Sequence, residues 1–332
     1  MRLADIAAHC NVSLSTVSRA LSGTPGVKPE VRELILATAR EKNYHQPISM
    51  AGRRVAVLAS ASAMIDYQRN QFTTYVLEGI RARAAALDME LMTRGVSGSE
   101  GEAAFLAEAA EDESLSGLLF LTVDDYQLLS DARAIGKPIV LVNGDDPTMQ
   151  FSSVAPHNRG AAAVATRHLI SLGHRRILFC TRSGRRTIQR RRDGWHDELP
   201  EELRATSADL VAEAEDWTPD AARAAIKSAI EAGIEFTAVL CAADTLAIGA
   251  IHALQEAGLS VPDDVSVVGI DGLPQGELVE PALTSVHVPM RSIGEAAVDL
   301  IREHFVDAGY IARRLELSCR LIVRSSDGPA RN

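Results

Sequence analysis

The sequence of 332 residues lacks any hydrophobic run long enough to cross a membrane. It also lacks the apolar core of a secretory signal, because Asp5 and His9 interrupt the stretch where that core would lie. The four cysteines are isolated from one another, which argues against a disulfide framework or a metal site. These absences predict a cytoplasmic protein with buried free thiols, no membrane partner, no metal and no cofactor.

Signatures of common α/β enzymes are missing as well. The sequence has no nucleophile elbow, phosphate-binding loop, dinucleotide fingerprint or metal-ligand spacing. The segment Gly269-Ile-Asp-Gly272 is too loose for a cofactor motif, and His168 and His174 flank a predicted helix end, where we interpret them as structural. We therefore expect no catalytic residues, and an α/β enzyme is the least favoured hypothesis.

Charge is distributed unevenly along the chain. Residues 1–54 hold eight Lys and Arg against four Asp and Glu, a net charge of +4. The whole chain has a net charge of −10, so the residues after 54 carry −14. A basic head on an acidic body is typical of a protein whose head meets phosphate groups. A charge of +4 is also ordinary for a small domain, so this pattern needs support from the motifs.

The first stretch predicts two short helices joined by a tight turn. Leu3 and Ile6 lie on one helical face, Asn11 tolerates the left-handed backbone of a turn, and Ser13 is a predicted N-cap for the second helix. A third helix is predicted over residues 29–42, with Val31, Leu34, Ile35, Thr38 and Ala39 as its inward stripe. The pattern favours a helix-turn-helix DNA-binding domain over an ordinary helical hairpin.

After a short linker, apolar strand-like runs alternate with helix-like stretches. Continuous apolar strands are expected where helices cover both faces of a parallel sheet. The predicted fold is an all-α N-terminal helix-turn-helix domain followed by an α/β body of two doubly wound parallel-sheet lobes. The predicted boundaries are residues 1–46 for the helix-turn-helix domain, 47–54 for a short hinge and 55–332 for an effector-binding and dimerisation domain, with lobe 1 at about 55–155 plus 287–312 and lobe 2 at about 156–286 plus 313–325.

Several motifs, in order along nearly the whole chain, resemble those of the lactose-repressor family of bacterial transcription regulators. They are Leu3-Ala-Asp-Ile-Ala-Ala, Asn11-Val-Ser, Thr16-Val-Ser-Arg-Ala-Leu, Asn43-Tyr44, Asn70-Gln-Phe, Leu77-Glu-Gly-Ile, His168-Leu-Ile-Ser-Leu-Gly-His-Arg-Arg-Ile, Thr237-Ala-Val-Leu-Cys-Ala-Ala-Asp, Val261-Pro-Asp-Asp-Val-Ser-Val-Val-Gly-Ile-Asp and Leu283-Thr-Ser-Val. The resemblance implies a homodimeric regulator, with lobes of the periplasmic-binding-protein type, that binds a two-fold symmetric operator in double-stranded DNA. A small effector, usually a sugar or related metabolite, is expected between the lobes and would control operator affinity.

The resemblance also implies DNA-contacting residues. Leu14, Ser15 and Arg19 fall on positions that read base edges, and an arginine can fork to guanine O6 and N7. Ser13 and Thr16 suit phosphate oxygens. Met50 aligns with the family's minor-groove leucine, but the hinge before it is about three residues short, so Met50 is either an apolar wedge or part of a simple tether.

We expect seven residues to bind the effector: Phe72, Asn143, Arg191, Trp217, Asp244, Asp271 and Met290. The resemblance places Asn143, Arg191, Trp217 and Asp271 on effector contacts of the family, and Ala243, just before Asp244, stands where the family usually has Asn. The ordinary alternatives are core packing for Trp217, helix capping for Asp244 and Asp271, and a surface ion pair for Arg191. Asn143 stands where the family usually has Asp, and the run 182–192 is dense in arginine. This departure suggests an anionic effector, such as a sugar acid or phosphorylated sugar, with a solvated basic loop as the alternative.

The sequence therefore predicts a DNA-binding transcriptional regulator, most simply a repressor. A stand-alone solute-binding protein with the same body is the main alternative, and the DNA-binding head counts against it. The tail after Val323 has no leucine heptads, so we expect a dimer without a tetramerising coiled coil.

Overall fold

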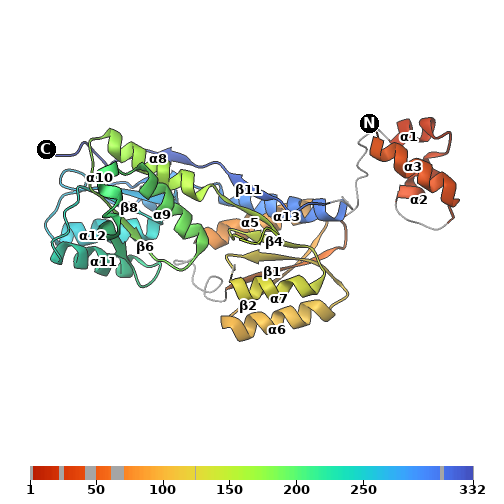
Figure 1. Cartoon of the computed structure of the whole chain (residues 1–332), viewed down its shortest axis with the longest axis horizontal. Helices are drawn as coiled ribbons and strands as arrows, with labels where there is room; N and C mark the ends of the chain where they lie inside the picture. The colour runs from red at the N-terminus through yellow and green to blue at the C-terminus, as the bar shows by residue number, and fades with distance from the viewer. Residues whose placement is uncertain are drawn as a thin grey trace.

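A computed structural model describes residues 3–21, 26–41, 50–60, 71–123, 125–306 and 310–331 (Figure 1). It contains a small helical head and an α/β body with two sheets, which confirms the predicted fold class. Among these residues, no helix is long and apolar enough to span a membrane.

The head packs three helices around one centre: α1 (Leu3–His9), α2 (Leu14–Leu21) and α3 (Pro29–Glu41). Ile6, Val17 and Ile35 each supply a fully buried side chain from a different helix. Leu34, predicted on the inward stripe, is instead 51% exposed, because α3 turns Ile35 and Thr38 toward the other two helices.

The turn of the helix-turn-helix forms as its residues predict. Asn11 adopts a left-handed φ of +52°, which its short polar side chain tolerates better than most. Ser13 caps α2, because its Oγ accepts a hydrogen bond of 3.1 Å from the N–H of Thr16. The predicted end of the head at Asn43-Tyr44 and residues 47–49 of the predicted hinge lie outside the described residues.

Lobe 1 is built on a parallel six-stranded sheet in the order β11-β5-β4-β3-β1-β2. Its strands are β1 (Arg54–Ser60), β2 (Glu90–Val96), β3 (Leu115–Leu121), β4 (Ile139–Val142), β5 (Ser152–Pro156) and β11 (Arg314–Leu317). Its helices are α5 (Gln71–Ala86) and α13 (Met290–Val306) on one face, and α6 (Gly98–Glu111), α7 (Tyr126–Ala132) and the 3₁₀ turn η1 (Arg133–Ile135) on the other. Along β1, Val55 and Val57 face the first pair of helices while Ala56 and Leu58 face the second, which explains the unbroken apolar run.

Helices α5 and α13 cross closely through two glycines. A Cβ at Gly79 would lie 2.0 Å from the carbonyl oxygen of Arg291, and one at Gly294 would lie 2.1 Å from that of Val76. Only glycine permits this approach from either side. The first helix of lobe 1 is thus fixed to a helix from the last fifth of the chain.

Lobe 2 is built on a second six-stranded sheet, in the order β12-β10-β9-β8-β6-β7, in which β12 alone pairs antiparallel. Its strands are β6 (Ile177–Thr181), β7 (Val211–Glu213), β8 (Ala238–Cys241), β9 (Ser266–Asp271), β10 (Thr284–His287) and β12 (Arg320–Ile322). Helices α8 (Asn158–Ser171) and α9 (Arg186–Glu198) pack together, as do α11 (Pro219–Glu231) and α12 (Asp244–Glu256) (Figure 1). Three short helical segments complete the lobe: α10 (Glu201–Arg204), η2 (Ser207–Leu210) and η3 (Pro274–Glu277).

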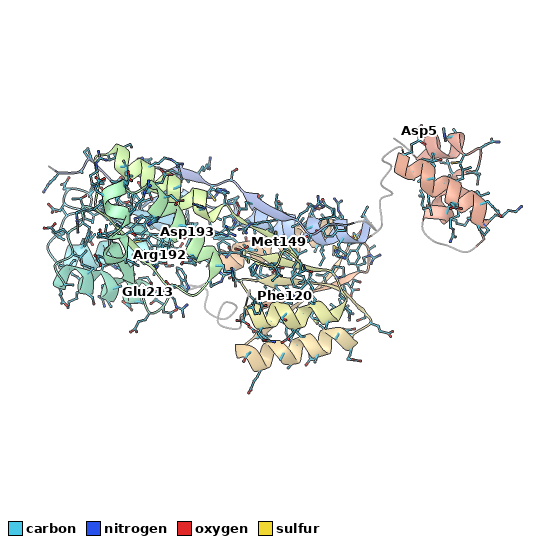
Figure 2. All side chains as sticks on the ribbon, viewed as in Figure 1. Asp5, Phe120, Met149, Arg192, Asp193 and Glu213 are labelled. Atoms are coloured by element: carbon cyan, nitrogen blue, oxygen red, sulfur yellow. The ribbon has the colours of Figure 1, made fainter. Side chains whose placement is uncertain are left out.

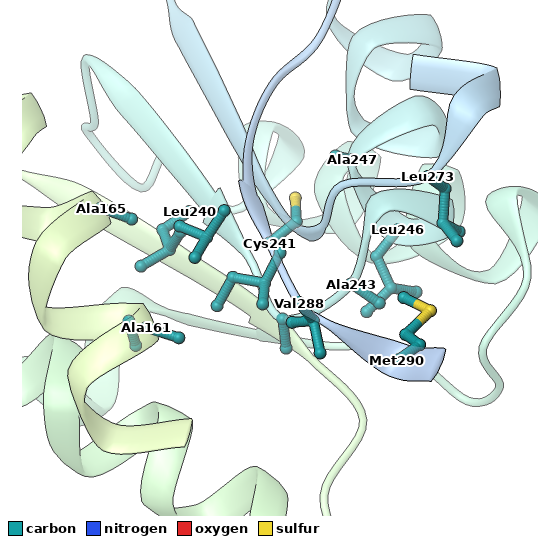
Figure 3. Packing of buried hydrophobic residues seen from close by; sticks show 14 of the residues in the cluster. Ala161, Ala165, Leu240, Cys241, Ala243, Leu246, Ala247, Leu273, Val288 and Met290 are labelled. Carbon is teal, nitrogen blue, oxygen red and sulfur yellow. The ribbon is translucent and has the colours of Figure 1, made fainter. Parts of the chain in front are cut away.

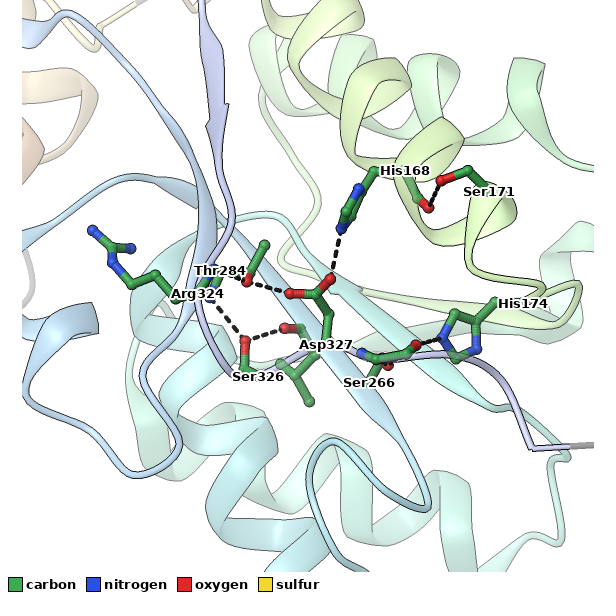
Figure 4. Close-up of polar contacts among 10 residues, drawn as sticks. His168, Ser171, His174, Ser266, Thr284, Arg324, Ser326 and Asp327 are labelled. Atoms are coloured by element: carbon green, nitrogen blue, oxygen red, sulfur yellow. Dashed lines mark hydrogen bonds and ion pairs between the residues drawn. The ribbon is translucent and has the colours of Figure 1, made fainter.

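A C-terminal strap, residues 324–331, closes the edge of lobe 2 (Figure 4). His168 donates from Nε2 to Oδ2 of Asp327 at 2.6 Å, and His174 bonds to the carbonyl of Gly328 at 3.0 Å. Burial lowers the pKa of His174, which fits a neutral imidazole in the interior. Both histidines therefore hold the strap, which confirms their interpretation as structural.

The chain passes between the lobes after β5, after β10 and after β11. Residues 313–325 were expected in lobe 2, and the pairing of β11 corrects this boundary. Arg314–Leu317 pairs in register with Ser153–Pro156 of lobe 1, so the last crossing falls between β11 and β12.

Candidate functional site

The outer side of α2 carries the positions predicted to read base edges. Val17 and Ala20 turn toward the core of the head, which leaves Leu14, Ser15 and Arg19 exposed. Leu14 is 52% exposed, an apolar side chain presented to solvent on the helix that would enter a groove. The structure thus places the three predicted base contacts on one accessible surface.

Hydroxyl groups cluster at the N-terminus of the same helix. The Oγ of Ser13 lies 2.9 Å from that of Ser15 and 2.8 Å from Oγ1 of Thr16. Backbone N–H groups and hydroxyls at a helix N-terminus suit a phosphate oxygen, as predicted for Ser13 and Thr16.

Met50 lies inside the body and not in a free hinge. Its side chain is 3% exposed within the core of lobe 1, and its carbonyl accepts a hydrogen bond of 3.0 Å from the N–H of Arg53. In this arrangement Met50 is inaccessible to DNA. The packing corrects the expectation of a minor-groove wedge and favours the tether, with the body beginning at Met50.

A second site forms at the carboxyl ends of the lobe 2 strands, where open α/β sheets bind ligands. Arg191 of α9 reaches inward and is 4% exposed. It donates from Nη1 to the carbonyl of Ala242 and from Nε to Oδ1 of Asn158 at 2.8 Å, and its Nη1 lies 3.4 Å from Oδ1 of Asp271. The structure therefore brings Arg191 and Asp271 together, as predicted, and adds Asn158, which the sequence analysis did not assign.

Asp271 combines a strained backbone with a buried carboxyl group, whose charged form is disfavoured by burial. It is 7% exposed with a φ of +140°, a region that favours glycine. Burial raises the pKa of its carboxyl to about 7, an effect that the nearby Arg191 opposes and the neighbouring Asp244 reinforces. Asn143, at the end of β4, has a left-handed φ of +52° as well.

Four buried polar atoms around this site have no hydrogen-bond partner among the described residues. They are Oδ1 of Asn143, Nδ2 of Asn158, and the hydroxyls of Thr181 and Thr187. Thr187 lies one helical turn before Arg191 and so shares its face of α9. Buried polar groups normally have partners, so this set is suited to a ligand rich in hydroxyl groups.

Asp244 has a structural role, which corrects its assignment as an effector contact. It is completely buried, and its carboxylate accepts hydrogen bonds from the N–H of Leu273 at 2.6 Å and the hydroxyl of Ser285 at 2.5 Å. Both partners hold the loop that follows Asp271. Asp244 therefore positions that loop and has no exposed atom to offer a ligand.

A cavity of about 400 Å³ between the lobes joins two of the predicted positions. Asp271 and Met290 line it together with Tyr75 of lobe 1 and His287 of lobe 2. Met290 begins α13 and lies among Ala243, Leu246 and Leu273 in the shared core, where only 6% of it is exposed (Figure 3). The sequence analysis missed Tyr75, although it lies one helical turn after Phe72.

Phe72 and Trp217 are both half-buried, in line with either a packing or a ligand-facing role. Phe72 lies in the first turn of α5. Trp217 follows β7 at the carboxyl edge of the lobe 2 sheet, beside the loop that Arg182 joins through a hydrogen bond of 3.1 Å to the carbonyl of Glu215. Among the described residues, no hydrogen bond or ring contact joins either aromatic side chain to Arg191.

Most of the arginine-rich run is engaged with the protein itself. Arg182 and Arg185 donate to backbone carbonyls, Arg190 pairs with Asp145, and Arg191 binds within the site. Arg192 and its neighbour Asp193 lie on α9 (Figure 2). Four of the six arginines thus have partners within the protein, and most of the run forms α9, so the run is neither a solvated basic loop nor a cluster of free cations.

A second cavity between the lobes, of about 380 Å³, has a mixed charge. Arg185 and Arg186 of lobe 2 line it opposite Glu102, Asp125 and Tyr126 of lobe 1. Partial burial and the neighbouring Asp125 raise the pKa of the Glu102 carboxyl. An anion at this mouth would meet both signs of charge.

Comparisons with known proteins identify both parts of the chain. Residues 2–46 match the family described as bacterial regulatory proteins, lacI family, and residues 166–326 match the periplasmic binding protein-like domain. The chain is 32% identical over 340 residues to the HTH-type transcriptional regulator MalR of Streptomyces coelicolor, covering 99% of this chain and 97% of the relative.

Two solved structures match the chain over nearly its full length. The transcriptional regulator CelR–cellobiose complex is 26% identical with a TM-score of 0.74, covering 98% of this chain and 99% of that one. The lac repressor dimer bound to operator and the anti-inducer ONPF is 25% identical with a TM-score of 0.70, covering 98% of both chains. These are regulators and not enzymes, in agreement with the sequence.

Proposed function

This chain is a transcriptional regulator that belongs to the lacI family, and from that premise we propose that it is an operator-binding repressor controlled by a carbohydrate or sugar-derived acid. The observation that carries the proposal is the buried meeting of Arg191 with Asp271 and Asn158 at the carboxyl edge of lobe 2. A guanidinium, a carboxylate and unpartnered amide and hydroxyl groups together match the donors and acceptors of a polyhydroxylated ligand.

The proposed DNA-binding form is a homodimer on a two-fold symmetric operator. The accessible base-reading face of α2 and the relation to the lac repressor dimer support it. Leu14, Ser15 and Arg19 would contact base edges, and Ser13 and Thr16 would contact phosphates.

A ligand panel tests the effector. Thermal unfolding of the full chain is measured with ribose, cellobiose, hexuronates and hexose phosphates, and stabilisation by mass action identifies the class that binds the folded state. Stabilisation by neutral sugars alone would exclude the acidic effector. Failure of every sugar and sugar acid would overturn the carbohydrate proposal.

Selection of bound fragments from sheared genomic DNA tests the regulator. Enrichment of one palindromic site by the pure protein, and its loss when the stabilising ligand is added, is expected for an inducible repressor. Enrichment only with ligand present would reverse the direction of control and contradict it.

A further inference from the structure

Two arginines of lobe 2 reach across to a single turn of lobe 1. Arg185 donates to the carbonyl of Asn143, and Arg190 binds the carboxylate of Asp145 through Nε at 2.9 Å and Nη2 at 2.8 Å. Both arginines belong to the start of α9, and both partners belong to the turn that follows β4. The next residue along α9 is Arg191 of the effector site.

The Asp145 carboxylate is shared between the lobes. Its side chain is 6% exposed; Oδ2 accepts from Arg190, and Oδ1 accepts from Nη1 of Arg314 at 2.5 Å. Arg314 lies on β11 of lobe 1, the strand just before the last crossing between the lobes. One oxygen therefore serves contact between the lobes and the other serves contact within lobe 1.

The network continues to residues beside the crossings between the lobes. Arg314 also binds Oε1 of Glu316 at 2.7 Å, and Oε2 of Glu316 lies 3.3 Å from Nε2 of His157. His157 caps α8, since its Nδ1 accepts from the N–H of Gly160 at 3.0 Å. Polar contacts thus run from α9 to the start of α8, through residues on both sides of the lobe boundary.

We propose that Asp145 is a positioning residue that couples closure of the lobes to α9. Its pair with Arg190 holds that helix, and with it Arg191, against lobe 1. The inference rests on the proposed function, because closure of the lobes has a regulatory meaning only if an effector binds between them.

The arrangement is reversible because of Arg314. Removing one partner from a buried charge is usually costly, since the other charge is left uncompensated. When Arg190 leaves, however, Asp145 keeps Arg314, and Arg190, whose side chain is already 36% exposed, returns to water. The pair can therefore open without stranding a buried carboxylate.

The distance between the lobes tests the proposal in the full chain without ligand or DNA. Spin labels at Ala104→Cys in lobe 1 and Lys227→Cys in lobe 2, with Cys319→Ser to remove the one partly exposed thiol among the described residues, report that distance by pulsed electron resonance. Labelled chains are diluted with unlabelled protein so that only distances within one chain are read.

Arg190→Met and Arg314→Met form a matched pair, since each removes one arginine from the same carboxylate. We expect Arg190→Met to add a second, longer population of distances, and Arg314→Met to keep the single distribution of the unmodified chain. An unchanged distribution for Arg190→Met, or the same shift for both variants, would overturn the proposal.

Thermal unfolding shows whether each variant is folded. If Arg190→Met does not fold, Asp145→Asn replaces it, with the same longer population expected and an unchanged distribution counting against the proposal. Because no sugar or operator enters the measurement, its failure leaves the proposed function standing. Failure of the ligand panel would leave the distance result intact.

Discussion

Arg191 donates from Nε to Oδ1 of Asn158 at 2.8 Å, and so joins α9 to the first turn of α8. The same guanidinium approaches Asp271 at the end of β9 and donates to the carbonyl after β8. One side chain thus connects four elements of lobe 2 at the edge that faces lobe 1.

Arg191→Met should abolish stabilisation by whichever sugar stabilises the unmodified chain. The substitution removes the guanidinium and leaves Asp271 as a buried carboxylate without its cation. Thermal unfolding with and without ligand measures the loss. Arg192→Met, one position along the same helix, is the control, and equal loss in both variants would show that α9 rather than the Arg191 fork is responsible.

The buried carboxyl of Asp271 makes stability depend on pH. Its pKa is about 7 in the folded state and about 4 in the unfolded chain, so the folded state binds more protons between these values. Stability contributed by the protonated form is complete below pH 4 and is lost as the pH rises through 7. Denaturant unfolding at pH 5 and pH 8 should show a smaller difference for Asp271→Asn than for the unmodified chain. An equal difference would assign the pH dependence to other groups.

The crossing of α5 and α13 should not tolerate a methyl group. Gly79→Ala places a Cβ 2.0 Å from a carbonyl oxygen, and overpacking of this kind costs about 1–3 kcal/mol of unfolding free energy. Gly101→Ala in α6 is the control, because its Cβ would meet Val96 at an ordinary 3.8 Å and alanine favours the helix. Denaturant unfolding separates the two, and equal stabilities would contradict the close crossing.

Arg19→Ala should leave the head folded while weakening sequence discrimination. Its side chain is exposed, with Nε 3.4 Å from the carbonyl of Ser15 one turn earlier, so the core of the head does not depend on it. The expected loss is roughly 1–3 kcal/mol for one base pair of each half-site. Binding titrations on the selected operator and on random DNA measure it, and an equal loss on both would argue against base reading.

Elements with a plain apolar pattern could be predicted from the sequence almost to the residue. Ile139–Val142 is an unbroken apolar run, and Ile177–Thr181 is apolar up to its last residue; both are strands with those bounds. The turn at Asn11 and the cap at Ser13 follow from local backbone chemistry, and the structure confirms both. Local signals of this kind need no knowledge of the rest of the fold.

Helix α9 shows why other parts of the structure could not be predicted from the sequence. Its sequence is dominated by arginine, so the periodic apolar signal reduces to residues such as Ile188 and Trp195. Besides its packing against α8, the helix is held by a buried arginine and by contacts to lobe 1. The pairing of Arg190 with Asp145 depends on how two separate surfaces meet, and no spacing in the sequence encodes it.

The positions of the strands in the chain decide when each lobe can be completed during synthesis. The edge strand β11 and the helix α13 of lobe 1 come from residues 290–317, and lobe 2 receives β12 and its strap only from residues 320–331. Neither lobe has all of its strands and helices until the ribosome has nearly finished the chain. The last helix of the head, by contrast, ends at Glu41. A nascent chain of this protein thus carries a finished DNA-reading head long before it has a body able to sense a ligand.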